Sequence, residues 1–258
     1  MRALLLLAAL LATSGCAKLL GFDEFSATGG GDDEPGDDAA VTVDTAPVGP
    51  RLRISGLVRG STDIDQPAAP LPGIVVQYFD RAGTMRDEVA TDASGQYILD
   101  LAQVNGEVDG FLHLTDSAWR DSYVHFPAPL TTDVTVTAGM FTTGTISQLA
   151  SQGSVIHQPA RAAILFRVRT AAGAPVAGAT VTIDSDCGAG ACGDVIYTNA
   201  QGRPDVSLTS TSSSGLAYAF SVVEGGYEPF ATVAGVPFGG RYYGIGDGTM
   251  VFIDLVKN

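Results

Sequence analysis

Apolar residues alternate with polar or small ones over several short stretches of the chain. The positions that show this best are Leu52, Ile54, Val58, Val134 and Val136. A period of two residues is typical of a β-strand that buries one face. Two further runs, residues 75–79 and 181–183, are rich in β-branched and aromatic side chains, which strands favour. The pattern therefore predicts a protein built mainly of short strands.

Turn signals separate these runs roughly every eight to twelve residues. They stand at Pro72-Gly73, Ala82-Gly83, residues 92–95, Ala172-Gly173 and Gly225-Gly226. Spacing this short favours antiparallel β-sandwiches over β–α–β units. Residues 145–150 carry the one helical pattern that we expect, and they lie between two β-rich stretches.

The two β-rich stretches have matching motifs, which indicates an internal repeat. Gly73 corresponds to Gly178, 105 positions later, and Gly95 corresponds to Gly202, 107 positions later. In both stretches a threonine stands four residues before the second of these glycines. A nearly constant offset predicts a tandem duplication of a unit of about 100 residues.

The repeated motifs resemble a known domain family. LPGIVV (71–76) followed by TDASGQY (91–97) is similar to the carboxypeptidase-regulatory-like, or transthyretin-like, β-sandwich domain. The second stretch resembles it through GAPVAGATV (173–181) and TNAQG (198–202), but departs from it at Arg203-Pro204, where an aromatic residue is usual. Such motifs mark strands and turns, so they specify a fold and hardly a function.

The resemblance implies an all-β fold with two tandem transthyretin-like or Ig-like antiparallel β-sandwiches, and the composition of the N-terminal segment places a disordered acidic tether before them. We expect the sandwiches at 51–142 and 161–258, with a connector at 143–160. Alternation places the following residues in the two cores: Ile74, Val76, Tyr97 and Leu99, then Val168, Val181, Ile183 and Val206. Units of about 100 residues are large enough to fold alone, so we expect two independent sandwiches.

The first fifteen residues have the features of a secretory signal peptide. Arg2 precedes an apolar run at residues 3–12, which is shorter than the roughly 20 residues that span a bilayer. The run ends in Thr13-Ser14-Gly15-Cys16, which resembles the lipobox of bacterial lipoproteins and implies a lipid on Cys16. The following Ala17-Lys18 resembles the sorting pattern for the outer membrane. The alternative is an ordinary signal peptide with a chance cysteine.

Residues 16–50 are predicted to be a linker. They include a run of glycines and acids at residues 29–38 without a periodic apolar face, a composition that disfavours a packed core. The lipid would then hold the sandwiches to a membrane of the bacterial cell envelope, outside the cytoplasm.

The other two cysteines, Cys187 and Cys192, form an even pair in a chain expected to be exported. Glycines and alanines between them allow the backbone to turn back, so we predict a disulfide that closes a short loop and stabilises the fold by about 2 kcal/mol. The alternative is a metal pair, although no histidine lies nearby. Asp184, Asp186 and Asp194 flank this loop and could bind calcium, but their spacing matches no EF-hand.

Charge and composition exclude some function classes. The chain carries 28 acidic and 14 basic residues, a net charge of −14, so we expect no nucleic-acid partner, because phosphate would repel it. With three histidines and three cysteines, a zinc cluster is not expected. The sequence has no nucleophile elbow, P-loop or dinucleotide fingerprint. We therefore predict no catalytic residue, metal or cofactor.

One enzymatic alternative stays open. Intradiol dioxygenases resemble this domain in fold and hold iron with two tyrosines and two histidines. The first repeat offers Tyr97, Tyr123, His113 and His125, but it lacks the His-x-His pair of that family. His157, in the connector, has no paired ligand spacing either.

Aromatic residues in loop-like segments are the remaining candidates for a binding face. They are Trp119, Tyr123, Tyr242 and Tyr243. Exposed aromatic rings stack on sugars or prolines, whereas the simpler interpretation is that they cover the sandwich's own core. The sequence thus predicts an envelope lipoprotein with a non-enzymatic binding, adhesion or scaffolding role toward a protein or glycan ligand. A carbohydrate-binding accessory lipoprotein is the first alternative.

Overall fold

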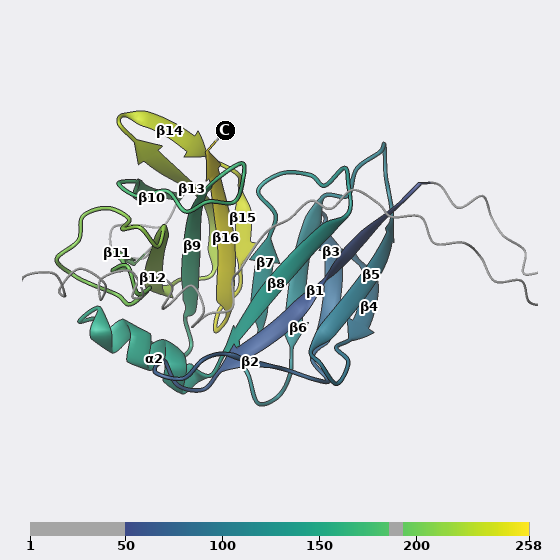
Figure 1. Ribbon diagram of the computed structural model, residues 1–258, viewed down its shortest axis with the longest axis horizontal. Helices are drawn as coiled ribbons and strands as arrows, with labels where there is room; N and C mark the ends of the chain where they lie inside the picture. The colour runs from purple at the N-terminus through teal and green to yellow at the C-terminus, as the bar shows by residue number, and fades with distance from the viewer. Residues whose placement is uncertain (1–49, 186–192, 258) are drawn as a thin grey trace, which may run out of the picture.

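The computed structural model describes residues 50–185 and 193–257, and it is built almost entirely of β-strands (Figure 1). The predicted signal peptide, the lipid site Cys16, the linker up to residue 49, the Cys187–Cys192 disulfide and Asp186 all lie outside these residues. The first half contains β1 (Arg51–Ser61), β2 (Ala69–Pro70), β3 (Val75–Asp80), β4 (Met85–Ala90), β5 (Gln96–Ala102), β6 (Gly110–Thr115), β7 (Ser122–His125) and β8 (Val134–Phe141). The second half contains β9 (Ala162–Thr170), β10 (Thr180–Ser185), β11 (Val195–Tyr197), β12 (Leu216–Val222), β13 (Gly225–Val233), β14 (Val236–Gly239), β15 (Tyr243–Ile245) and β16 (Met250–Lys257).

The first half is a sandwich of two sheets. In one sheet β1 pairs antiparallel with β5 and parallel with β8, and in the other the order is β4-β3-β6-β7. Residues of β5 alternate strictly between exposed and buried, as a strand with one face on a core should. The predicted core residues Ile74, Val76, Tyr97 and Leu99 are all buried here, which confirms the alternation argument for this half.

The second half repeats the arrangement. β9 pairs antiparallel with β12 and parallel with β16, as β1 does with β5 and β8. β13 pairs antiparallel with β10, β14 and β15 to form the opposite layer. The two halves therefore have the same strand pairing around their first strand, as the predicted duplication requires. The pairs β1–β8 and β9–β16 are parallel and so depart from the antiparallel pairing expected of these sandwiches, because the first and last strands of each half run in the same direction.

The two sandwiches share a sheet. β7, at the edge of the first half, pairs in parallel with β16 of the second, which produces one eight-stranded sheet in the order β11-β12-β9-β16-β7-β6-β3-β4. Figure 1 shows β7 and β16 next to each other at the centre of the molecule. The pairing satisfies backbone groups that two edge strands would otherwise leave open. The prediction of two independent sandwiches is therefore wrong for this layer.

This shared sheet is buried on both faces in its second half. On β9, Ile164 and Phe166 face the core of the second sandwich, whereas Ala163 and Leu165 belong to the core that fills the first. A strand covered on both sides reads as an unbroken apolar run, which is what residues 162–166 are.

Two of the expected core positions of the second half are not fully buried. Val168 and Val181 are buried as predicted, and Ile183 is partly buried against the core. Val206 is 63% exposed, because it lies in the segment between β11 and β12 that forms no strand. The prediction that Val206 is buried is wrong, because alternation of apolar and polar residues indicates burial only within a strand.

The connector forms α2 (Thr143–Gln152), where the sequence predicts a helix over 145–150. The Thr142 side chain caps it by accepting a hydrogen bond from the Thr145 backbone N–H at 3.1 Å. Ile146, Leu149 and Ala150 pack in the first core together with residues of β9, so the helix helps to bridge the two halves. Among residues 50–185 and 193–257 no helix is long and apolar enough to cross a membrane.

Candidate functional site

A cleft of about 700 Å³ lies where the two halves meet, beside the β7–β16 pairing. The first half contributes the turn at residues 81–83 and parts of β6 and β7, and the second contributes residues 224–226 and 241–246. The side chains that line it are Arg81, Phe111, Tyr123, His125, Glu224, Arg241, Tyr242, Tyr243 and Ile245. A cavity of this size is in the range of small-molecule sites.

Three of the four aromatic residues that the sequence nominated meet in this cleft. Tyr242 is 61% exposed, Tyr123 is half-buried, and Tyr243 is buried. Trp119 is not part of the cleft, because it packs against the first core with its ring beside Gly60. The interpretation as core packing therefore holds for Trp119 and for the buried Tyr243, which belongs to the second core, and in part for Tyr123, which packs against that core.

The aromatic rings form a continuous row across the sheet. Phe79, Phe111 and His125 are register partners on β3, β6 and β7, so their side chains share one face. Ring centroids are 5.6 Å apart for Phe79 and Phe111, 5.1 Å for Phe111 and His125, and 4.8 Å for His125 and Tyr243. These spacings are those of favourable aromatic pairs. The row runs into the cleft and ends at Tyr243 of the second half.

His125 lies at the floor of the cleft and is 5% exposed. Its Nε2 is buried without a hydrogen-bond partner among the described residues. Burial lowers the pKa of His125 to about 4, and the positive charge of Arg241 acts in the same direction, while the backbone of Gly244 partly offsets both. The ring is therefore neutral at neutral pH. Burial likewise raises the pKa of the neighbouring Tyr243 to about 12, so its phenol also stays uncharged.

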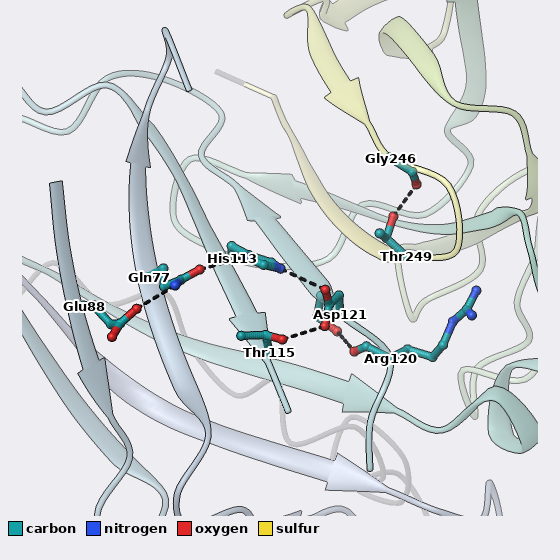
Figure 2. Close-up of polar contacts among 9 residues, drawn as sticks. Gln77, Glu88, His113, Thr115, Arg120, Asp121, Gly246 and Thr249 are labelled. Atoms are coloured by element: carbon teal, nitrogen blue, oxygen red, sulfur yellow. Dashed lines mark hydrogen bonds and ion pairs between the residues drawn. The ribbon is translucent and has the colours of Figure 1, made fainter. Parts of the chain in front are cut away.

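Polar side chains form a second row, from Glu88 through Gln77 and His113 to Asp121 (Figure 2). Gln77 donates from Nε2 to Glu88 at 2.6 Å, and its Oε1 lies 2.9 Å from His113 Nδ1. The other ring nitrogen of His113 lies 3.2 Å from Asp121, whose second oxygen accepts from Thr115 at 2.8 Å. Both nitrogens of His113 thus have partners within the sheet, unlike Nε2 of His125.

This polar row holds Tyr123 in place. The His113 ring stacks on Tyr123 with centroids 4.5 Å apart, and Asp121 fixes His113. The Asp121 carbonyl also accepts from the Met250 N–H at 2.8 Å at the start of β16. Thr249 in turn donates to the Gly246 carbonyl at 2.7 Å (Figure 2), which closes the turn that carries the far wall of the cleft.

The charges around the cleft cancel. Arg241 is largely buried and forms an ion pair with Asp109 of the first half, and Arg81 approaches the same carboxylate at 3.7 Å. Glu224 lies exposed on the opposite rim. The two arginines and the two carboxylates therefore give the cleft a net charge near zero, although the protein as a whole is strongly acidic.

The four residues of the dioxygenase alternative do not all lie together, because Tyr97 is separated from the other three. Tyr97 lies in the core of the first sandwich, where its hydroxyl donates to the Val136 carbonyl at 3.0 Å, and burial raises its pKa. His113, Tyr123 and His125 lie on the outer face of the other sheet. Across residues 50–185 and 193–257, no three His, Cys, Asp or Glu side chains gather as a metal site would require.

The remaining sequence candidates lie elsewhere. His157 is buried against Phe220, with ring centroids 6.2 Å apart, and is remote in sequence from the cleft's lining. Asp184 and Asp194 are exposed, and the calcium hypothesis stays a prediction because Asp186 is not among the described residues.

Several residues of the cleft could not be identified from the sequence. They are the lining residues Arg81, Phe111, Glu224 and Arg241 and, at the floor of the cleft, His125. They come from segments far apart in the chain, and only the β7–β16 pairing brings them together. The one sequence feature that could have identified a member of this group is the position of Arg241 directly before Tyr242 and Tyr243.

No protein-family model matches this chain, and no curated protein is similar to it. Among solved structures, it is similar to the shaft pilin SpaA of Lactobacillus rhamnosus GG, with 12% identity over 81% of this chain and 98% of that one and a TM-score of 0.26. It is also similar to a dioxygenase domain from the cellulolytic bacterium Streptomyces sp. SirexAA-E, with 14% identity over 45% and 97% of the two chains and a TM-score of 0.28.

The Bacillus anthracis TIE protein matches 80% of this chain, with 12% identity and a TM-score of 0.26. This chain spans 34% of the length of that protein. At TM-scores this low, function has to be argued from the cleft itself.

Proposed function

We propose that this chain is an exported, lipid-anchored binding protein of the bacterial cell envelope, and that the cleft between its two halves is its ligand site. The observation that carries the proposal is the convergence of Tyr123, Tyr242 and Tyr243 on one cleft of about 700 Å³. Tyr242 is mostly exposed, and an exposed ring beside polar groups is typical of a site that meets a ligand.

Contacts between the halves support a preformed cleft. Besides the β7–β16 pairing, Arg203 forms an ion pair with Asp65, and Arg120 donates to the Arg161 carbonyl at 3.2 Å. A site whose walls are already fixed loses little conformational entropy on binding. The role is therefore recognition by a rigid surface, and we propose no catalytic residue and no cofactor.

The anchor is the second part of the proposal. The motif that ends at Cys16 supports a lipid, and the acidic segment at 16–50 would separate the sandwiches from the membrane. Two or more acyl chains give stable attachment. We place the protein at the outer membrane because Ala17-Lys18 resembles the corresponding sorting signal.

The proposal is tested by blocking the cleft. Gly244 on β15 is exposed, and a Cβ at this position would meet no atom within 4 Å, so Gly244→Trp fills the cleft without disturbing the core. Val236 on β14 is 62% exposed and lies outside the cleft, which makes Val236→Trp a matched control. The full mature chain, purified in detergent, is applied to arrays of oligosaccharides and of peptides.

We expect binding to at least one class of probe, about tenfold weaker in Gly244→Trp and unchanged in Val236→Trp. Binding that survives Gly244→Trp would place the ligand site elsewhere. Absence of binding to every probe would contradict the proposed role itself.

A further inference from the structure

Tyr242 presents an open ring at the rim of the cleft. Its hydroxyl end lies directly over Gly226, where a Cβ would stand only 1.6 Å from Tyr242 Oη. Only glycine leaves room for the ring at this point, so Gly226 seats one part of Tyr242 while most of the side chain stays exposed. The half-buried rings of Phe111 and Tyr123 line the same cleft and come from the first half of the chain. A flat, apolar ring of a ligand can stack against such surfaces.

The polar groups of the cleft include both donors and acceptors. Arg81 and Arg241 supply N–H donors, and Glu224 supplies carboxylate acceptors. Gly244 adds exposed main chain, because it has no side chain to cover it. A ligand with many hydroxyl groups, each able to donate and accept, is satisfied by such a mixture. An aliphatic ligand would leave these groups unpaired, at a cost in affinity.

The balance of charges around the cleft indicates whether a charged or an uncharged ligand is favoured. Asp109 neutralises Arg241 and lies 3.7 Å from Arg81, and Glu224 balances the remaining positive charge. The chain as a whole carries a net charge of −14, so its long-range field repels an anionic polymer. Neither the local nor the global charge favours an acidic ligand.

We infer that the cleft binds an uncharged carbohydrate, with one sugar ring stacked between Tyr242 and the Phe111–Tyr123 wall and its hydroxyls bonded to Arg81 and Glu224. This inference rests on the binding role proposed above and names the ligand class. Sugars present an apolar ring face and an edge of hydroxyls, and the cleft offers aromatic rings next to balanced polar groups.

The test measures the affinity of the full mature chain, in detergent, for three probes. They are neutral oligosaccharides of glucose, mannose or galactose, acidic oligosaccharides of uronic acids, and proline-rich peptides. We expect binding to a neutral oligosaccharide that changes little from low to high ionic strength, because no charge pair forms with the ligand. Tyr242→Ala should weaken it about tenfold, Tyr242→Phe should largely retain it, and Val236→Ala should leave it unchanged.

Other outcomes separate this inference from the proposed function. Binding of an acidic sugar or a peptide, lost in Gly244→Trp, would overturn the neutral-carbohydrate inference while the cleft remained the binding site. A neutral sugar that binds equally well to Tyr242→Ala would also overturn it. Absence of binding to all three probes would overturn the inference and the proposed function together.

Discussion

His125 has surroundings that its sequence context does not indicate. It stands on a strand like His113, yet only His113 has partners for both ring nitrogens. His125 is enclosed by Phe111 and Tyr243, and its pKa falls from 6.5 to about 4 mainly because burial disfavours the charged ring.

This environment predicts a loss of stability in mild acid. Between pH 6.5 and about 4 the unfolded chain binds a proton at His125 that the folded chain excludes, so the free energy of unfolding falls as the pH falls through this window. The contribution reaches about 3 kcal/mol at the acid end. Chemical denaturation at a series of pH values measures it. His157, whose pKa is also lowered to about 4 by burial, adds a change of the same sign.

The variant His125→Phe isolates the effect, because it keeps an aromatic ring and removes the titration. Its free energy of unfolding should fall less steeply with falling pH than that of the wild type over this range. In the double variant His125→Phe/His157→Phe the dependence on pH should be weaker still. An identical pH dependence in the wild type and in His125→Phe would contradict the assignment.

Arg167 and Asp254 form a buried ion pair between β9 and β16. The Nε–Oδ1 and Nη2–Oδ2 distances are 2.7 and 2.8 Å, and both side chains are almost fully buried. The two residues are direct register partners, so the pair fixes the alignment of these parallel strands.

We predict strong coupling between the two residues. Arg167→Met or Asp254→Leu alone should destabilise the fold by about 3 to 5 kcal/mol, because each removes one member of a buried ion pair while the other charge stays buried. The double variant should be more stable than either single one. Denaturant unfolding of the three variants provides the double-mutant cycle, and additive losses would show that the pair does not act as a unit.

At the scale of elements, a strand that is buried on one face only could be predicted better from the sequence than a strand that is buried on both faces. β5 alternates because one face is buried and the other is exposed, and its core positions follow from the sequence. β9 and β16 are covered on both faces, so their sequences are apolar without alternation. For that reason the sequence does not show which of their side chains face which core. The turn motifs around Gly95 and Gly202, which both adopt positive φ, were predicted because glycine favours that conformation.

The candidate site was only partly predictable for a related reason. Tyr242 and Tyr243 stand out because loop aromatics are visible in a sequence, and Tyr123 was named with them. The pairing of β7 with β16 joins segments more than a hundred residues apart, and no local pattern encodes such a parallel contact. The cleft depends on this pairing, so its composition could not be derived before the fold.

The shared sheet predicts that the two halves do not fold independently. Residues 161–258 alone would expose the edge of β16 and the face of the sheet that carries Leu165, Tyr218 and Phe252, all buried in the first core. Residues 50–142 alone would lose α2 and expose β7. We expect the intact chain to unfold in one thermal transition and each fragment to be less stable or to self-associate. Fragments that melt as monomers at the temperature of the intact chain would contradict this.

At the scale of the whole molecule, we propose a rigid pair of sandwiches that a lipid anchor holds at a membrane. The anchor is a prediction from the sequence around Cys16. Mass spectrometry of the mature N-terminus should find an acylated cysteine, and Cys16→Ser should shift the protein from the membrane fraction to the soluble fraction or leave it unprocessed. An unmodified cysteine on a freely soluble protein would overturn the anchor but leave the cleft unaffected.

The central claim is that the joint between the halves is the ligand site. It is tested most directly by nuclear magnetic resonance of the full mature chain during titration with the bound oligosaccharide. We predict that chemical-shift changes concentrate at residues 81–83, 224–226 and 241–246 and at Phe111 and Tyr123, which line the cleft. Changes that concentrate instead around Trp119, or on the outer face of β10 and β14, would contradict it.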